Sequence, residues 1–240
     1  MYRKIKILFI ALSLSLSLMA QEEVLDSAYL KVMYQYVYLS DTLELTTRED
    51  LLVLQIGKNL SKCYSYYSNQ SDSIHKNGGK AAWQAMFNKA MEDFNKHRNR
   101  AVFMNSFPRR RTMTYTYRNY PTGKMTVTDF IGSEDLIYED EMHAQEWEIG
   151  DSVKTILDYN CQKATCNFRG RAYEAWFAPD IPVSEGPWMF SGLPGLIMEV
   201  YDTRKHYVFQ ITGLQQVENE PIVFFGTFGR KSQIQKNQPN

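Results

Sequence analysis

Apolar and aromatic residues recur at every second position through most of this chain, and this period constrains the fold more than any other feature. The segment 28–40 (AYLKVMYQYVYLS) is the clearest case, because its alternate residues are all large and apolar or aromatic: Leu30, Val32, Tyr34, Tyr36 and Tyr38. Alternation of this kind is typical of a β-strand with one buried face. The same pattern covers segments 111–130, 145–159, 171–180, 196–202 and 206–218.

The connections between these segments are short, which favours antiparallel neighbours over crossovers. Pro121-Thr122-Gly123 predicts a hairpin turn within 111–130, and Gly150-Asp151 predicts a turn within 145–159. The expected fold is therefore mainly β (α+β). It consists of a single twisted antiparallel sheet, or a half-barrel, with one helical insertion.

The insertion is predicted at 80–97 (KAAWQAMFNKAMEDFNKH), where the period changes from two to that of a helix. Apolar residues at i, i+3, i+4, i+7, i+8 and i+11 form one stripe, namely Trp83, Met86, Phe87, Ala90, Met91 and Phe94. We expect this amphipathic helix to pack its stripe on the sheet.

The N-terminus is typical of a secretory signal peptide. Three basic residues precede the short apolar run 7–19, and Ala20 offers a small residue at the cleavage position. We therefore expect residues 1–20 to be removed, 21–222 to form one β-rich domain and 223–240 to form a polar tail. No later segment is apolar enough to predict a membrane span.

Charge and motifs exclude several classes of function. Residues 21–240 hold 24 basic and 27 acidic residues, so no basic excess favours nucleic acid as a partner. The run 109–111 (RRR) is interpreted as a solvated loop. The sequence has no phosphate loop, no nucleophile elbow and no pair of histidines at metal-ligand spacing. It therefore predicts no cofactor, metal site or catalytic residue.

A region rich in proline and glycine interrupts the strands. Four of the eight prolines lie between 179 and 194: Pro179, Pro182, Pro187 and Pro194. Proline cannot donate a ladder hydrogen bond, so this region is expected to be a rigid crossover. Pro194-Gly195 fits the centre of a type II turn. We expect Trp176 and Trp188 to pack the crossover on the core.

The same residues carry a resemblance to a family. The stretch KATCNFRGRAYEAWFAPDIPVSEGPWMFSGLPGLIMEVYD resembles the signature of the GLPGLI family of exported bacterial proteins, named after a hexapeptide that spans Gly192 to Ile197 here. Residues matching the motif outside the hexapeptide are Arg169, Gly170, Arg171, Trp176, Pro182, Gly186 and Pro187. The resemblance implies a Gram-negative cell-envelope location, periplasmic or associated with the outer membrane. It implies no established activity, cofactor or catalytic residue.

The cysteines depart from the pattern that the resemblance implies. Cys161 matches it, whereas Cys63 and Cys166 are unusual. A disulfide between Cys63 and Cys166, with Cys161 left as a buried thiol, is the hypothesis that follows.

Arg169 and Arg171 are the strongest polar groups of the motif. If both lie on one strand they face the same side and form a fork for a carboxylate or phosphate. The simpler interpretation, which we favour, is that they pair with Asp180, Glu185 or Asp202 and pin the crossover. Gly192, Pro194 and Gly195 complete the candidate binding motif together with the two tryptophans.

Three functions are compatible with this sequence. The favoured one is a non-enzymatic binding or carrier module for a hydrophobic ligand or an unknown envelope protein, with a cavity lined by tyrosine and phenylalanine and the crossover at its mouth. The second is a structural or assembly factor of the outer membrane. The least favoured is a periplasmic hydrolase that uses Arg169 or Arg171 with Glu185 or Asp180.

Overall fold

The structure is a computed structural model that describes residues 23–74, 79–107, 109–131 and 134–225. The expected signal peptide, at 1–20, and residues 226–240 of the expected tail lie outside the described residues. Within the described part of the chain, none of the helices combines the length and the apolar character needed to cross a membrane.

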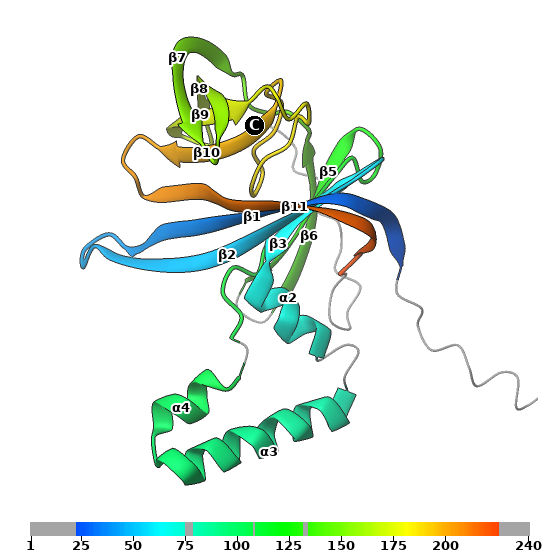
Figure 1. The fold of residues 1–240 in the computed structure, drawn as a ribbon, viewed down its shortest axis with the longest axis vertical. Coiled ribbons are helices and arrows are strands. Elements are labelled where there is room, and N and C mark those ends of the chain that lie inside the picture. The colour runs from blue at the N-terminus through cyan, green and yellow to red at the C-terminus, as the bar shows by residue number, and fades with distance from the viewer. Residues whose placement is uncertain (1–22, 75–78, 108, 132–133, 226–240) are drawn as a thin grey trace, which may run out of the picture.

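Eleven strands form one antiparallel sheet, which confirms the expected fold class (Figure 1). The strands are β1 (Val24–Asp41), β2 (Thr46–Gly57), β3 (Ser61–Ser65), β4 (Tyr115–Arg118), β5 (Lys124–Ile131), β6 (Glu134–Glu141), β7 (Glu148–Ile156), β8 (Tyr159–Phe168), β9 (Arg171–Ala178), β10 (Leu196–Asp202) and β11 (Tyr207–Val223).

The sheet consists of two meanders joined by its first and last strands. Strands β1 to β6 pair in chain order, β7 to β11 do the same, and β1 pairs with β11. The strands β6 and β7 are therefore the two edges, although only residues 142–147 connect them. An extended connection of this length reaches about 25 Å, whereas ten spacings of a flat sheet add up to about 48 Å. The sheet must therefore curl strongly, and it remains open between β6 and β7.

The period-two pattern predicts the buried face of β1 correctly. Leu30, Val32 and Tyr34 are buried, and Tyr36 packs against the same core. The hairpin predicted at 121–123 is present between β4 and β5. The turn predicted at Gly150-Asp151 is wrong, because both residues lie within β7. The chain turns instead at Leu157-Asp158, where two consecutive positive φ angles (47° and 66°) give the mirror-image turn that suits a two-residue hairpin.

The inside of the curled sheet is filled by the crossover, which we define as residues 179–195. Met189, Phe190 and Leu193 are almost completely buried and belong to the same cluster as the core residues of β1, β2, β9, β10 and β11. The expected crossover is thus confirmed, and it forms part of the core.

The helical insertion follows β3 and has three parts. They are α2 (Tyr66–Ser73), α3 (Gly79–His97) and α4 (Arg100–Asn105). Helix α2 begins at the N-cap Ser65, whose side chain accepts a hydrogen bond from the Ser68 N–H. The prediction that the stripe of α3 packs on the sheet is wrong. Figure 1 shows α3 and α4 standing away from the sheet, and the rings of Phe87 and Phe94 contact Phe103 from α4 instead.

A second, smaller cluster holds the end of β11. Lys62 on β3 is 2 % exposed, and its ammonium donates to the carbonyl of Val223 over 2.9 Å. The same ammonium lies 4.6 Å from the ring centroid of Phe225 and 4.7 Å from that of Tyr64. Ordered packing therefore continues to Phe225 and includes the first three residues of the expected polar tail, 223–225.

All three cysteines are free and buried, so the expected disulfide between Cys63 and Cys166 is wrong. The two thiols belong to different meanders, on β3 and β8. The sulfur of Cys63 accepts a hydrogen bond from the N–H of Trp188 at 3.2 Å, so the crossover occupies the space beside it.

Candidate functional site

The crossover is held in the sheet by one buried arginine, Arg118, at the end of β4. Its side chain is 1 % exposed and pairs with Glu185 at 2.9 Å. The other terminal nitrogen lies within 3.2 Å of three crossover carbonyls, those of Gly186, Trp188 and Phe190. A buried guanidinium is stable only when its donors find acceptors. Arg118 and the crossover backbone therefore satisfy each other.

Side chains from other parts of the sheet satisfy more of this backbone. Tyr34 on β1 donates at 2.7 Å to the carbonyl of Ile197, which lies on β10 two residues beyond the end of the crossover. Thr116 on β4 donates to Trp188 O at 2.9 Å, and Trp147 from the connection between the edges donates to Ser191 O at 2.8 Å. Buried carbonyl groups cost free energy unless they are hydrogen-bonded. The crossover is therefore fixed along most of its length.

Gly195 is required by close approach and not by the expected type II turn. A Cβ atom on this residue would lie 2.3 Å from the carbonyl oxygen of Ala178. The N–H that would close the predicted turn, that of Leu196, donates to Ile181 O instead. The type II turn predicted at Pro194-Gly195 is therefore wrong, because β9 passes directly against this backbone.

Arg169 and Arg171 do not form the predicted fork. Arg169 lies with Gly170 in the two-residue turn between β8 and β9, where both φ angles are positive, and it pairs with Asp140 on β6. Arg171 begins β9 and pairs with the buried Asp202 at 3.1 Å. One of the favoured partners, Asp202, is thus confirmed for Arg171.

The remaining candidates separate into two groups. Glu185 is bound by Arg118 and by the hydroxyl of Ser61, whereas Asp180 is exposed at the start of the crossover. Trp176 lies on β9, where its indole N–H meets the hydroxyl of Tyr201 and the Lys154 ammonium stands over its ring. Pro194 and Gly192 are exposed. The structure does not bring these residues together with Arg169 and Arg171.

Trp188 does meet both arginines, at a cavity that we call the aromatic pocket. This cavity has a volume of about 240 Å³. Its apolar walls come from β1, β2, β9, β11 and the crossover, and they consist of Tyr36, Leu52, Tyr173, Trp188, Tyr207 and Phe209. Thr112, Thr114, Arg169 and Arg171 complete its lining.

The rings of the aromatic pocket are held in place by stacking. Tyr36 and Phe209 are register partners on β1 and β11, and their ring planes are nearly parallel with centroids 4.3 Å apart. Trp188 continues the stack at 6.4 Å from Phe209. The guanidinium of Arg171 covers the ring of Tyr207 at 4.7 Å. The walls are thus largely pre-formed, as small-ligand sites usually are.

Burial keeps the phenols of this pocket protonated. Burial raises the pKa of Tyr36 above its ordinary value. It also raises the pKa of Tyr173 to about 12, and the nearby carboxylate of Asp202 contributes to this second shift. At neutral pH the pocket therefore offers neutral hydroxyl groups and two guanidinium groups. A guanidinium has five N–H donors, so pairing with one carboxylate does not exhaust it.

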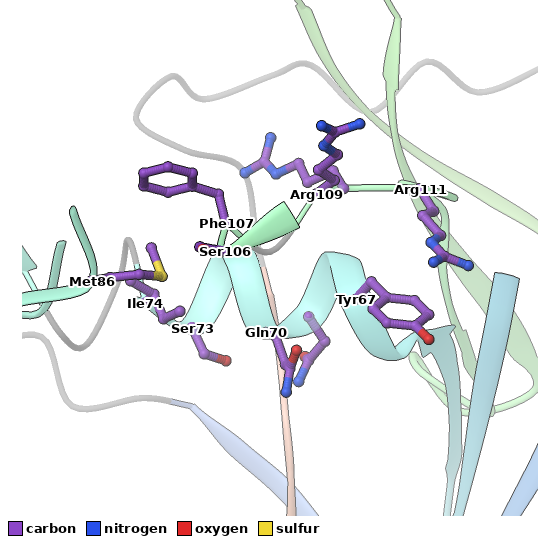
Figure 2. Close-up of a pocket in the computed structure, with 11 residues that line it drawn as sticks. Tyr67, Gln70, Ser73, Ile74, Met86, Ser106, Phe107, Arg109 and Arg111 are labelled. Carbon is purple, nitrogen blue, oxygen red and sulfur yellow. The ribbon is translucent and has the colours of Figure 1, made fainter. Parts of the chain in front are cut away.

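A second and larger cavity, the arginine cleft, lies between α2 and the arm formed by α3 and α4 (Figure 2). Its volume is about 1060 Å³. Figure 2 shows Ile74, Met86 and Phe107 at one end of the cleft and Arg111 beside Tyr67 at the other. Arg111 is fixed there by the carbonyl of Glu49 at 2.8 Å and by the ring of Tyr67.

Arg110 is fixed in a comparable way, since it pairs with the buried Asp72 at 2.5 Å. Arg109, the first residue of the run, is exposed at the cleft. The interpretation of 109–111 as a solvated loop is confirmed, because all three residues are exposed and lie outside the helices and strands. Arg110 and Arg111 make their specific contacts from within this loop.

The cysteine thiols and the hydroxyl of Ser191 are buried. Burial raises the pKa of the Cys63 thiol to about 11 and that of Cys166 to about 12, so both stay protonated at neutral pH. The hydroxyl of Ser191 lies 3.2 Å from Nδ1 of His143, but Ser191 is only 2 % exposed, which leaves no room for a substrate carbonyl. Within the described ranges, no three His, Cys, Asp or Glu side chains come together as metal ligands would.

Comparison with known proteins identifies a family over part of the chain and a fold over most of it. Residues 168–199 match a family model described as "Protein of unknown function (Porph_ging)". This stretch covers β9, the crossover and the start of β10. The chain is therefore similar to a family of unknown function over these residues, and the GLPGLI label itself is not confirmed. No curated protein matches the chain.

Two solved structures of a protein named PNGF-II share the fold. One, in space group C2, has a TM-score of 0.50 and 14 % identity over 79 % of this chain. The other, in space group P21, has a TM-score of 0.51 and 13 % identity over 80 %. The matched region spans only 28 % and 29 % of those chains. At this identity the likeness concerns the fold alone.

Proposed function

We propose that this chain is an exported, non-enzymatic binding module of the Gram-negative cell envelope. Its aromatic pocket receives one apolar group, a ring or a short acyl segment, from a ligand or envelope partner that also carries an anion. The observation that carries the proposal is the aromatic pocket itself, in which stacked rings meet two arginines. Trp188 of the crossover is one of its lining residues, and the sequence predicted a cavity lined by tyrosine and phenylalanine with the crossover at its mouth.

The size of the pocket limits the ligand. Pockets that enclose whole drug-sized molecules have volumes of about 300 to 1,000 Å³, and the aromatic pocket has about 240 Å³. The rest of the sheet interior is occupied by the crossover. The site therefore suits one apolar group of a ligand and is too small for a complete lipid cargo.

The polar lining favours an anion beside the apolar group. The guanidinium of Arg171 lies flat on Tyr207, and Arg169 approaches from the turn between β8 and β9. Arginine binds carboxylates and phosphates through paired N–H donors. An aromatic or acyl carboxylate places its ring or chain among the stacked rings and its charge at these donors.

Native mass spectrometry of protein released gently from the periplasm of its own cells is the first test. We expect an added mass that disappears on denaturation and identifies the class of ligand. Protein that carries no added mass from several growth conditions would count against a tightly held ligand.

The second test is direct titration with small probes, phenylacetate and hexanoate, each compared with its neutral amide. About ten heavy atoms at about 0.5 kcal/mol each correspond to a Kd of about 0.1 to 1 mM, so saturation-transfer NMR and calorimetry are suitable. We expect the carboxylates to bind and the amides to bind at least about threefold more weakly. Equal binding of both would contradict the role of the arginines.

A filling substitution tests whether binding occurs in the aromatic pocket. Thr112→Phe places a ring in the cavity and keeps the backbone N–H of Thr112, which donates to Asp50 at 2.9 Å. The matched control is Thr155→Phe on the exposed edge strand β7. We expect Thr112→Phe to abolish carboxylate binding and the control to leave it unchanged. Equal binding by both folded variants would place the ligand elsewhere and overturn the proposal.

A further inference from the structure

The helical arm, residues 79–107, buries very little of its own surface. Among its described side chains only Ala90 is buried, while Trp83 is 41 % and Phe87 39 % exposed. The rings of Trp83 and Phe87 contact Phe107, at the far end of the arm. Short helices are marginal in water unless an apolar face is covered. A further surface is therefore needed to cover these rings.

The charge of this region differs from that of the remaining chain. Residues 79–111 hold eight basic side chains and two acidic ones, whereas the remainder of residues 21–240 holds 16 basic and 25 acidic. The basic residues are Lys80, Lys89, Lys96, Arg98, Arg100, Arg109, Arg110 and Arg111. A net charge of about +6 concentrated in an otherwise acidic protein attracts an anionic surface.

The arginine cleft brings the apolar side chains and the basic charge of this region together. Its apolar end holds Met86 and Phe107, and Arg109 is exposed along its lining. The side-chain amide oxygen of Asn69, a residue that lines this cleft, is buried and has no hydrogen-bond partner among the described residues. Apolar groups, an exposed arginine and an unsatisfied acceptor in one cleft suit an amphiphile with a negative charge and a hydrogen-bond donor.

We propose that the helical arm and the arginine cleft dock on a membrane surface containing anionic phospholipid. Exposed aromatic residues on a helix of low overall hydrophobicity, accompanied by basic residues, are typical of segments that lie in a membrane interface. Trp83 and Phe87 enter the acyl boundary, and the basic side chains, Arg109 among them, meet lipid phosphates. This surface is separate from the aromatic pocket, so either proposal can fail alone.

Vesicle co-sedimentation of the mature chain tests this docking, with phosphatidylglycerol mixed into phosphatidylcholine and with phosphatidylcholine alone. We expect at least tenfold stronger binding to the anionic vesicles, and a loss of most of that difference between 50 mM and 500 mM salt. Equal binding to both kinds of vesicle, or none to either, would overturn the proposal. Inorganic phosphate at matched ionic strength should not release the protein, and full release by phosphate would also overturn it.

Variants separate the arm from the remaining surface. The pair Trp83→Ala and Phe87→Ala should lower binding to anionic vesicles at least fivefold. The pair Leu43→Ala and Leu45→Ala, between β1 and β2, should not, although these two side chains are even more exposed. Lys89→Glu with Lys96→Glu should abolish the preference for anionic lipid, and Lys58→Glu with Arg204→Glu should preserve it.

Two further measurements keep the test decisive. Circular dichroism should show that each variant keeps the wild-type helix content, so that lost binding reports the surface. Gel filtration at high concentration should show that the arm variants keep the oligomeric state of the wild type. Dissociation of an oligomer by these variants, with vesicle binding unchanged, would mean that a second copy covers the arm and would overturn the proposal.

Discussion

The crossover (179–195) and the helical arm (79–107) both connect strands of the same sheet, yet the crossover lies inside the sheet and the arm stands away from it (Figure 1). The crossover has little regular structure, and its carbonyls are bound by side chains of several strands. The arm has regular helices whose backbone groups bond one another. Regular secondary structure within a connection therefore does not decide whether that connection is rigid. What decides it is whether the rest of the fold supplies hydrogen-bond partners for its backbone groups.

The largest effect is expected from removing the residue that holds the crossover. Arg118→Met removes the charged partner of Glu185 and the arginine donor of the carbonyls of Gly186, Trp188 and Phe190. Glu185 keeps the hydroxyl of Ser61, and the Trp188 carbonyl keeps that of Thr116. Breaking a buried pair in this way costs about 3–5 kcal/mol of unfolding free energy. Urea denaturation measures the loss.

The matched control for this prediction is Arg48→Met, on an exposed part of β2. Surface substitutions usually change stability by no more than about 0.5 kcal/mol. If Arg118→Met cost no more than the control, the crossover would be held by apolar packing alone.

Arg118 also shows where the sequence stops being informative. In the segment YTYRNY it occupies the end of a strand just before a turn, a place where an arginine is usually solvated. Nothing local indicates that residues 185–190 lie over it, because that contact joins segments about 70 residues apart. The only sequence feature that indicates this role of Arg118 is the proline-rich crossover, because its backbone carbonyl groups need hydrogen-bond donors from other parts of the chain.

Local sequence patterns correctly predicted those structural features that depend on local interactions. The buried face of β1, the hairpin at 121–123 and the mainly β class follow from side-chain period and turn residues. The same reasoning failed for Gly150-Asp151, since Leu157-Asp158 adopts the turn without glycine. It also failed for the stripe of α3, because periodicity identifies an apolar face but not what covers it.

The candidate site was predicted in part for the same reason. The sequence predicted a cavity lined by tyrosine and phenylalanine with the crossover at its mouth, and separately it grouped the two arginines with acidic residues of the crossover. The structure places both arginines in the lining of the aromatic pocket, but not Asp180 and Glu185. Those two residues leave β9 along the crossover, Asp180 to solvent and Glu185 to Arg118. Residues close in sequence separate where the chain changes direction, which composition alone does not specify.

A second substitution tests the crossover through its backbone. Gly195→Ala would place a methyl group 2.3 Å from the carbonyl oxygen of Ala178, so either β9 or the crossover must move. Such overpacking costs about 1–3 kcal/mol. The control is Gly150→Ala, whose added methyl group would meet nothing closer than 3.8 Å. Equal unfolding midpoints for the two variants would contradict the close approach.

The arm should respond differently to the loss of its central ring. Phe103 contacts Phe87, Phe94 and Phe107, so Phe103→Ala removes most of the ring packing between α3 and α4. We expect the helical circular dichroism signal to fall. The unfolding free energy of the sheet, obtained from urea denaturation followed by near-ultraviolet signals, should change by less than about 0.5 kcal/mol. A loss of about 3 kcal/mol, typical of a buried phenylalanine, would show that arm and sheet unfold as one unit.

A small loss of stability is also expected where a short connection is tied by one accessible carboxylate. Asp26 accepts the N–H groups of Asn59 at 2.7 Å and Leu60 at 3.2 Å, between β2 and β3. Partial burial by itself raises the pKa of Asp26, but these bonds and that from the Ser27 N–H outweigh it and hold the pKa below its ordinary value. Asp26→Asn should cost about 1 kcal/mol at pH 7.

The pH dependence of that small loss distinguishes a charge effect from a packing effect. Because the folded pKa lies below the unfolded one, the carboxylate stabilises the protein fully above about pH 4 and loses this contribution as the pH falls through the folded pKa. Denaturation of Asp26→Asn and the wild type should therefore differ at pH 7 and converge near pH 2. A difference that persisted at pH 2 would mean that the shape of this turn, and not the charge of Asp26, holds the connection between β2 and β3.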